Sequence, residues 1–323
     1  MKAIQVEGGR LVWTNADRPA LDVGQVRIAV HATAVNRADL VQRQGGYPPP
    51  PGASPILGLE CAGEVIEVGE NVRRVKPGDR VCALLAGGGY AEEVVVPAGQ
   101  VLKMPKSLSY VEAASIPEVF ATAYLNLYME GGLKTGERVL LHAGASGVGT
   151  AAIQLCKNTH NPSFVTVSGQ RKIDVCVALG AQGGHDRAAG SFVPAVQAWA
   201  GGEGVQVILD PVAAPYFADN LKVLSIDGRL VLIGMMGGTS VEANLAMVLM
   251  KRIKVIGSTL RARSIAAKSM IMDGLKKDVW PALEEGRIKA IIEAVIPLQD
   301  AEKAHVLIAG NDTVGKVVLE LKR

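Results

Sequence analysis

The pattern of apolar positions changes part-way along the chain. In the first third, short apolar segments separated by Gly- and Pro-containing turns predict strands at residues 2–6, 26–34, 62–68, 80–85 and 90–97. Closely spaced strands with such turns are typical of a compact, barrel-like β domain. Ser109 and Glu112 then have the spacing of a capping box, which predicts the start of a helix leading towards a second domain.

From Arg138 onward, short apolar runs alternate with segments of helical pattern. The expected strands cover residues 139–142, 164–167, 205–210, 229–234 and 254–258, with a weaker one near 182–185. The expected helices between them lie around residues 151–157, 172–179, 192–200, 216–224 and 245–250. Alternating units of this kind predict an α/β architecture with a doubly wound parallel sheet.

The C-terminal segment predicts an insertion of one domain into the other. After Leu260 come helical segments and then a strand near 291–296, a helix at 299–309 and a last strand at 315–321. A completed six-stranded sheet has no place for that last strand, so we expect it to return to the N-terminal β domain. The predicted β domain therefore comprises residues 1–120 and 262–323, and the inserted α/β domain comprises residues 121–261.

Composition narrows the classes of partner. A chain of 323 residues with 49% hydrophobic and 20% charged residues is typical of a globular protein of two domains. The net charge of +3, without a dense Lys/Arg cluster and with only 4% aromatics, argues against nucleic acid as the main partner. We see no signal peptide and no apolar run long enough for a membrane span, so no membrane partner is expected.

The cysteines indicate a reducing environment. Their positions show no CxxC pair, which argues against a zinc knuckle or a disulfide scaffold: Cys61, Cys82, Cys156 and Cys176. We expect buried, reduced thiols and a cytoplasmic location.

The segment 138–153 carries the clearest chemical signal. A short apolar strand runs into a Gly/Ser-rich turn that opens directly on an Ala-rich helix, and Ser146 stands where the second glycine is usual. This order predicts a dinucleotide phosphate site, because glycines allow close approach and a helix N-terminus attracts negative charge. The alternative is an ordinary tight strand–helix turn. The residues expected to hold the pyrophosphate are Gly144, Ala145, Ser146, Gly147, Val148 and Gly149.

The end of the next strand bears on which dinucleotide is bound. There the chain reads Ser168, Gly169, Gln170, Arg171 and Lys172, and no acid follows until Asp174. An acid near this point would bind the ribose hydroxyl of NAD, whereas basic groups can pair with the 2′-phosphate of NADP. NADP(H) is therefore preferred over NAD. The alternative is a solvated helix start that carries incidental charge.

Several motifs together resemble the zinc-independent quinone oxidoreductases, the zeta-crystallin-like branch of the medium-chain dehydrogenase/reductase superfamily. They lie at residues 36–39, 44–50, 58–63, 75–81, 87–90 and 142–154. The last of them is similar to the stress-inducible NADPH quinone oxidoreductase subgroup. The resemblance implies a GroES-like β-barrel catalytic domain joined to an NADP(H)-binding Rossmann domain.

The resemblance also implies reduction of a quinone or activated enone without a metal. Alcohol dehydrogenases of the superfamily bind zinc through a Cys where this chain has Asn36 and through a His where it has Leu59. In the resembling family, Asn36 would donate to the acceptor oxygen, and Tyr47 would stack on the acceptor or give it a proton. The alternatives are a turn-capping Asn and a loop Tyr. Val41 departs from the family pattern, in which many members carry a second tyrosine.

Further residues are assigned by the same resemblance. The adenosine phosphate would be held by Ser168, Gly169, Arg171 and Lys172, and the rest of the cofactor by Thr122, Gly234, Met235 and Leu260. Relatives often carry a Tyr at the position of Asp186, so the adenine contact is open. We interpret Arg261 and Arg263 as interface or salt-bridge residues. His142 is interpreted as a hydrogen-bonded core histidine.

The sequence leaves more than one function open. The leading hypothesis is an NADPH:quinone or enone reductase. The alternatives are a non-catalytic NADPH-binding structural or redox-sensing protein, an enoyl or alkenal reductase, and a zinc alcohol dehydrogenase. Because strand 254–258 is expected at a sheet edge, we also predict a homodimer that pairs across a two-fold axis.

Overall fold

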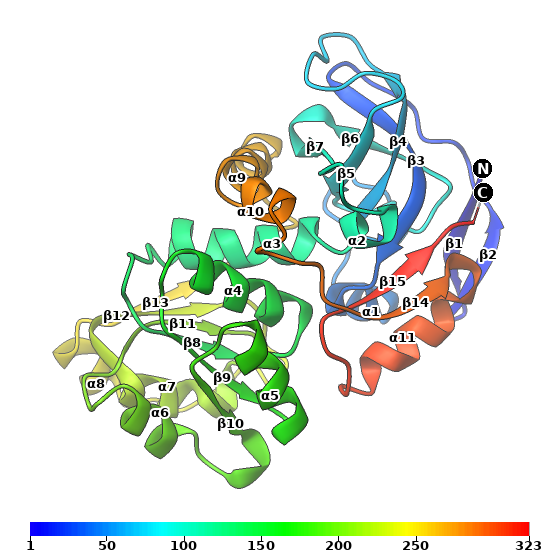
Figure 1. Cartoon of the computed structure of the whole chain (residues 1–323). Helices are drawn as coiled ribbons and strands as arrows, with labels where there is room; N and C mark the ends of the chain where they lie inside the picture. The colour runs from blue at the N-terminus through cyan, green and yellow to red at the C-terminus, as the bar shows by residue number, and fades with distance from the viewer. Residues whose placement is uncertain (323) are drawn as a thin grey trace. The chain divides into compact units, whose positions relative to one another are not determined.

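The computed structural model describes residues 1–322. By its internal contacts the chain divides into two compact units. Unit 1 comprises Met1–Ala121 together with the segment from Leu260 onward, and unit 2 comprises Thr122–Thr259. Figure 1 traces this path, with the green and yellow middle of the chain forming unit 2.

Unit 2 is built on a parallel sheet, which confirms the α/β prediction. In the described residues its six strands follow the order β10-β9-β8-β11-β12-β13, and every neighbouring pair is parallel. The strands are β8 (Val139–His142), β9 (Ser163–Val167), β10 (Gly183–Asp186), β11 (Val205–Asp210), β12 (Leu224–Leu232) and β13 (Lys254–Gly257). As expected, β13 forms one edge of the sheet.

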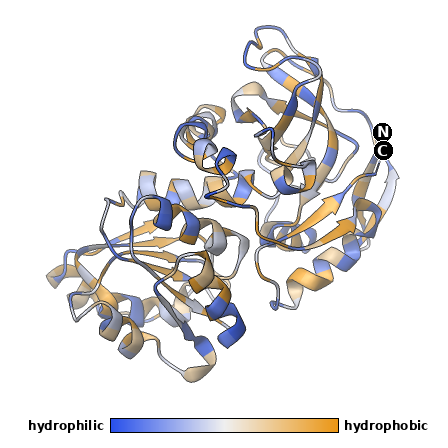
Figure 2. Ribbon diagram, in the orientation of Figure 1, coloured by the Kyte–Doolittle hydropathy of each residue, from blue (hydrophilic) through white to orange (hydrophobic). Residues whose placement is uncertain are grey.

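Helices cover both faces of this sheet (Figure 1). Helices α4 and α5 contact each other, and α7 contacts both α6 and α8. Their bounds are Gly147–Asn158 for α4, Gln170–Leu179 for α5, Val193–Trp199 for α6, Phe217–Val223 for α7 and Leu245–Met250 for α8. The core between sheet and helices joins strand residues Leu140, Ile208 and Leu230 to Phe192 and Leu221. Figure 2 shows the strands as the most apolar part of this unit.

Unit 1 contains a mainly antiparallel sheet, in agreement with the predicted β domain. The described residues place seven strands in it, in the order β14-β15-β3-β4-β5-β7, with β6 also pairing with β3. They are β3 (Gln25–Ala34), β4 (Glu60–Val68), β5 (Arg80–Leu84), β6 (Glu93–Pro97), β7 (Val101–Lys103), β14 (Ile292–Pro297) and β15 (Lys316–Glu320). The last strand, β15, pairs antiparallel with β3, so the predicted return of the C-terminus is confirmed.

Two strands and one helix of unit 1, β2 (Arg10–Asn15), β7 and α1 (Arg37–Arg43), were not predicted. The strand β2 forms a hairpin with β1 (Lys2–Glu7), and its residues are only partly buried, so its apolar pattern is weak. The strand β7 has three residues, too few for a periodic pattern. Helix α1 is short, and its capping box is formed by Asn36 and Asp39.

The remaining helices of unit 1 are α2 (Tyr110–Ala114), α9 (Ile265–Asp278), α10 (Trp280–Glu284) and α11 (Ala301–Ala309). Among them, α2 packs against β3, β4 and β5, α9 against β7, and α11 against β14 and β15. The capping box of Ser109 and Glu112 begins α2 as expected, but α2 ends at Ala114 and does not reach the second domain. Helix α3 (Pro117–Tyr124) continues into the π-helix η2 (Leu125–Glu130) and carries the chain from unit 1 into unit 2.

Several expectations about individual side chains can be checked directly. His142 is buried and hydrogen-bonds Thr166 and Asn220 at 2.8 and 2.7 Å, which confirms a core histidine. All four cysteines are buried free thiols, and burial raises the pKa of Cys156 to about 12. Within residues 1–322, no helix is both long enough and apolar enough to cross a bilayer.

Candidate functional site

The Gly/Ser-rich turn after β8 is packed so closely that side chains are excluded. A Cβ atom added to Gly144 would lie 2.6 Å from Cβ of Val165 on the neighbouring strand. One added to Gly149 would lie 2.4 Å from the carbonyl oxygen of Gly144. These glycines therefore allow the first turn of α4 to pack against the ends of β8 and β9, as the third glycine of a dinucleotide turn does.

The N-terminus of α4 presents free backbone donors. Ser146 is its N-cap and accepts a hydrogen bond from the N–H of Gly149 at 3.1 Å. The N–H groups of Gly147 and Val148, the first two residues of the helix, have no hydrogen-bond partner in the described part of the chain. Free N–H groups at a helix N-terminus are suited to a phosphate anion. The turn thus fits the pyrophosphate of a dinucleotide, with Ser146 holding the helix end.

The segment after β9 brings a buried ammonium group to the end of the strand. Lys172 lies in α5, is only 5% exposed, and donates from Nζ to Oγ of Ser168 at 3.1 Å. Gly169 has a positive φ of +86°, which favours glycine, and Arg171 is exposed. The first downstream acid, Asp174, is held by the side chain of Gln170 at 2.8 Å. A cation and a hydroxyl are therefore in contact where a 2′-phosphate is expected.

Asp186, whose relation to the adenine the sequence left open, lies at the same end of the sheet. Asp186 ends β10 and stands opposite Val167 in the parallel register of β10 and β9. Hydrogen bonds from the N–H groups of Ala188 and Gly169 lower the pKa of its carboxyl, so it is ionised at neutral pH. The signal for this contact is the parallel register of β9 and β10, which was not predicted from the sequence.

The other predicted cofactor residues are distributed over both units. Gly234 follows β12, and a Cβ atom added there would lie 3.0 Å from the carbonyl oxygen of Pro211. Met235 next to it is exposed. Thr122 is the first residue of unit 2, and Leu260, which is buried, is where the chain re-enters unit 1. These four residues carry no contact that distinguishes a cofactor site from ordinary structure.

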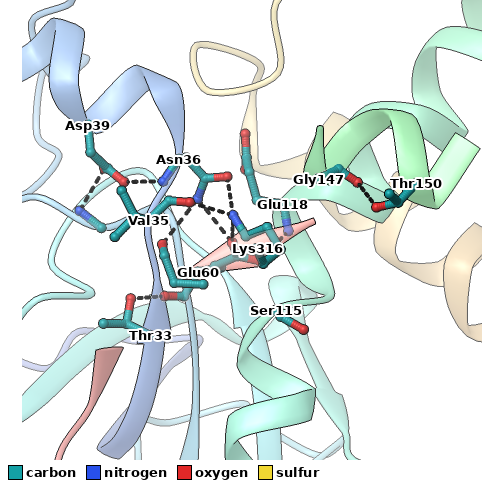
Figure 3. A network of polar contacts seen from close by, with 12 residues as sticks. Thr33, Val35, Asn36, Asp39, Glu60, Ser115, Glu118, Gly147, Thr150 and Lys316 are labelled. Atoms are coloured by element: carbon teal, nitrogen blue, oxygen red, sulfur yellow. Dashed lines mark hydrogen bonds and ion pairs between the residues drawn. The ribbon is translucent and has the colours of Figure 1, made fainter. Parts of the chain in front are cut away.

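In unit 1, Asn36 belongs to a buried ionic network (Figure 3). Nζ of Lys316 contacts Oε1 of Glu60 at 2.9 Å and donates to Oδ1 of Asn36 at 2.7 Å and to the carbonyl oxygen of Val35 at 2.7 Å. The amide nitrogen of Asn36 donates to Glu60 at 3.0 Å and to the carbonyl oxygen of Ala34 at 3.3 Å. Both amide hydrogens of Asn36 are thus engaged within the protein.

Lys316 was missed in the sequence, and so was its ion pair with Glu60, because the two residues lie far apart along the chain. Glu60 is 0% exposed, and its second oxygen accepts from the N–H of Glu118 at 2.9 Å. Burial, followed by the neighbouring Glu60, raises the pKa of the Glu118 carboxyl to about 8. Glu118 is therefore mostly neutral at pH 7 beside an ionic pair.

Asp39 and Tyr90 extend this polar network. The Asp39 carboxylate accepts from the N–H groups of Asn36 and Gly58 and from the hydroxyl of Tyr90 at 3.2 Å. Burial raises its pKa to about 6, against the opposing effect of these hydrogen bonds. The Tyr90 hydroxyl also contacts His305 at 3.2 Å, and burial lowers the pKa of that imidazole to about 4.

Tyr47 lies against Arg261 in the same unit. The guanidinium carbon of Arg261 is 5.2 Å from the centroid of the Tyr47 ring, and Nη1 donates to the Tyr47 carbonyl oxygen at 3.1 Å. Arg261 is 3% exposed, and no carboxylate among residues 1–322 pairs with it. The expected salt bridge of Arg261 is therefore not found among the described residues, because Nε and Nη1 donate to the backbone carbonyl oxygens of Ala86 and Tyr47 instead.

Comparison with known proteins identifies the family. Residues 22–106 match the alcohol dehydrogenase GroES-like domain, and residues 147–272 match the family described as zinc-binding dehydrogenase. The chain is 32% identical over 304 residues to the quinone oxidoreductase-like protein 2 of Bos taurus, covering 92% of this chain and 85% of that protein. The chain belongs to the quinone oxidoreductase-like members of the medium-chain dehydrogenase/reductase superfamily.

Solved structures support the same family. A quinone oxidoreductase of Pseudomonas syringae pv. Tomato DC3000 is similar with a TM-score of 0.86 at 29% identity, covering 99% of both chains. A mycobacterial protein solved as a complex with NADPH has a TM-score of 0.86 at 29% identity, covering 99% of this chain and 100% of the other. The CurK enoyl reductase has a TM-score of 0.87 at 27% identity, covering 99% of both. This oxidoreductase family thus includes quinone and enoyl reductases.

The name of the matched dehydrogenase family implies zinc, but the residues of this oxidoreductase do not suit it. Leu59 is a buried apolar residue, and Asn36 and Glu60 direct their oxygens at the ammonium group of Lys316. That cation already satisfies the oxygen atoms a metal would need. Among the described residues, no three His, Cys, Asp or Glu side chains are grouped so that they could hold a metal ion.

Proposed function

We propose that this oxidoreductase reduces a quinone or an activated enone with NADPH, without a catalytic metal. The observation that carries the proposal is the pair of phosphate-binding features in unit 2. These are the free N–H groups of Gly147 and Val148 and the contact of buried Lys172 with Ser168. They match the expected positions of the pyrophosphate and the 2′-phosphate. The names of the quinone oxidoreductase relatives support the acceptor class.

The chain contributes binding, orientation and proton transfer. NADPH, when bound, supplies a hydride to the electrophilic carbon of the acceptor. The turn 144–149 would hold the pyrophosphate. The adenosine phosphate would be bound by Ser168, Gly169, Arg171 and Lys172. The rest of the cofactor would lie along Thr122, Gly234, Met235 and Leu260. We assign Tyr47 to acceptor stacking and proton donation. Because both amide hydrogens of Asn36 are engaged, we assign it no donation to the acceptor oxygen and propose instead that it holds Glu60 and Lys316 in place.

The proposal is tested by following NADPH oxidation with ortho-quinones, para-quinones and alkenals. We expect turnover of at least one quinone and weaker turnover with NADH. Tight NADPH binding without turnover of any acceptor would overturn the enzymatic proposal and favour a structural or redox-sensing protein. Metal analysis of the active protein provides an independent check, because stoichiometric zinc would favour an alcohol dehydrogenase.

An enoyl or alkenal reductase is the second candidate, and the similarity to the CurK enoyl reductase favours it. Both reactions add hydride to a carbon conjugated with a carbonyl group. The two reactions are distinguished by measuring kcat/KM for a para-quinone and for an unsaturated thioester of similar size. A clearly higher kcat/KM for the thioester would identify unsaturated thioesters, and not quinones, as the substrate class.

Cofactor choice should respond in opposite directions to two substitutions. We expect Lys172→Met to weaken NADPH binding by about ten- to a hundredfold, because an ion-paired hydrogen bond to phosphate is lost. NADH binding should change little. We expect Asp186→Asn to strengthen NADPH binding by only a few-fold, because the carboxylate is partly exposed and screened by salt. Isothermal titration with both cofactors measures the effects, and equal losses for NADH and NADPH in Lys172→Met would contradict the assignment.

We propose a homodimer formed through the β13 edge. β13 is an edge strand, and exposed apolar side chains gather on it and on α8: Val255, Leu245, Leu249 and Met250. We expect the double substitution Val255→Glu and Leu249→Glu to convert a dimer to a monomer, because charge opposes burial at an interface. Val306→Glu, on an exposed position of α11, is the matched control. Light scattering measures the mass; a monomeric wild-type protein would refute the prediction.

We also propose a cytoplasmic location. The four cysteines are free thiols in both units, which is typical of proteins kept in a reducing compartment. Fractionation of cells carrying the tagged protein, with membrane and soluble markers, tests this.

A further inference from the structure

The guanidinium group of Arg261 has an unused donor inside unit 1. Nε donates to the carbonyl oxygen of Ala86 at 2.8 Å and Nη1 to that of Tyr47 at 3.1 Å. Nη2 is buried and has no hydrogen-bond partner among residues 1–322. A buried charged donor without a partner is costly, so its presence indicates a partner that the chain does not supply.

The groups around Arg261 add a second cation, and among the described residues no carboxylate forms an ion pair with either cation. Lys268 is 5% exposed, and its Nζ donates to the carbonyl oxygen of Arg261 at 3.2 Å. Two acids act on Arg261 through their charge, Asp39 and then Glu118, and Glu118 also acts on Lys268. The raised pKa of Glu118 leaves it mostly neutral at pH 7, and the Asp39 carboxylate is already bonded by the N–H groups of Asn36 and Gly58 and by Tyr90. The cluster of Tyr47, Arg261, Lys268 and Glu118 therefore favours an anionic oxygen over a neutral one.

Tyr47 supplies a second donor at this cluster. Its hydroxyl makes no hydrogen bond with any described residue, while its ring packs against the guanidinium group. Burial raises the pKa of this hydroxyl, with Glu118 acting in the same direction and Arg261 against it, so the phenol keeps its proton at neutral pH. Asn36, by contrast, has both amide hydrogens engaged with Ala34 and Glu60.

We propose that Nη2 of Arg261 and the hydroxyl of Tyr47 together bind the carbonyl oxygen of the acceptor and stabilise the negative charge it acquires. This inference rests on the proposed function and assigns Arg261 as a catalytic residue. As hydride adds to the conjugated carbon, the π electrons move to the oxygen and form an enolate. The Tyr47 hydroxyl then gives its proton to that oxygen and regains one from water. With a quinone, the carbon that received the hydride then loses a proton to water and the second carbonyl oxygen gains one, which gives the hydroquinone. The acceptor gains two electrons and two hydrogens, and NADPH becomes NADP⁺.

A phenol probe tests the anion site without turnover. 4-Nitrophenol titrates near neutrality, and its phenolate resembles the enolate. Its visible absorbance reports ionisation when it binds the protein without cofactor. We expect the wild-type protein to bind the phenolate more tightly than the phenol. Arg261→Gln should reduce this preference about 100-fold, as removal of an oxyanion donor does. Arg263→Gln, two residues away, is the matched control and should leave the preference unchanged.

Two further variants keep the test decisive. Tyr47→Phe should also lower the phenolate preference, by a smaller factor, because one neutral donor is lost. Arg261→Lys keeps a positive charge, so it should retain part of the phenolate preference that Arg261→Gln loses. An unchanged phenolate preference in both Arg261→Gln and Tyr47→Phe would overturn the inference. Circular dichroism and NADPH affinity show whether each variant is folded.

Kinetics separate this inference from the proposed function. With a quinone that the wild-type protein reduces, Arg261→Gln should lower kcat about 100-fold while KM for NADPH stays within a few-fold. If kcat is unchanged in Arg261→Gln, the inference fails and the quinone reductase proposal stands. If no acceptor is reduced but phenolate binding depends on Arg261, the anion site stands and the proposed function fails.

Discussion

Replacement of Lys316 by methionine is expected to lower the free energy of unfolding by about 3–5 kcal/mol. Lys316 and Glu60 are 4% and 0% exposed and form an ion pair at 2.9 Å. Without the ammonium group, Glu60 keeps two hydrogen bonds but loses its only charged partner in the described residues. Removing one member of a buried pair costs much more than the pair itself contributes, because the other charge stays desolvated. Urea unfolding followed by circular dichroism measures the loss.

Two controls make this prediction specific. The double substitution Lys316→Met with Glu60→Gln should recover most of the lost stability, because no unpaired charge remains. Lys303→Met breaks an exposed pair with Asp300 at 3.0 Å and should cost less than about 1 kcal/mol. If the double substitution is as unstable as Lys316→Met alone, the loss comes from packing and not from charge.

The substitution Gly149→Ala is expected to remove most of the affinity for NADPH. Its Cβ atom would lie 2.4 Å from the carbonyl oxygen of Gly144 and 2.5 Å from that of Ala143. Both neighbours are backbone atoms of the phosphate turn, so the turn must move to relieve the contact. Overpacking of this kind costs about 1–3 kcal/mol, and we expect NADPH binding to weaken by roughly ten- to a hundredfold. Fluorescence titration of NADPH measures this change.

The matched control for this substitution is Gly257→Ala at the end of β13. A Cβ atom there meets nothing within 4 Å, and its φ is not in the left-handed region. Gly257→Ala should therefore keep NADPH affinity within a few-fold of the wild type. Normal NADPH binding by a folded Gly149→Ala protein would contradict the placement of the phosphate at this turn.

Much of the fold could be predicted because the controlling patterns are local. Apolar runs of four to six residues followed by helical segments are enough to predict the strands of unit 2 and that these strands run parallel to one another. The expected helix at 216–224 ends at Val223, and β12 begins at Leu224 where a strand was expected only from 229. Element ends of this kind depend on tertiary contacts that a periodic pattern does not contain.

The part of the candidate site that depends on local spacing was predicted, and the part that depends on long-range contacts was not. The glycines of the turn and the pair Ser168 and Lys172 lie within a few residues of each other, so their spacing carried the information. Asn36 was named from the sequence as a candidate catalytic residue, but its hydrogen bonds were not foreseen. Its partner Lys316 is 280 residues away in the sequence. Nothing in the local sequence around either residue indicates this pairing.

The sequence by itself determined the two kinds of domain, the Gly/Ser-rich turn between strand and helix, and the absence of zinc-ligand residue types at Asn36 and Leu59. These features depend on residue type and short spacing, which a chain carries whatever its packing. Only the tertiary structure decided that Lys316 lies between Asn36 and Glu60, that Asp186 contacts Gly169, and that Arg261 is buried with a free donor. Each of these depends on strand register or on elements distant in the sequence, because burial and charge pairing are set by the packing of the whole unit.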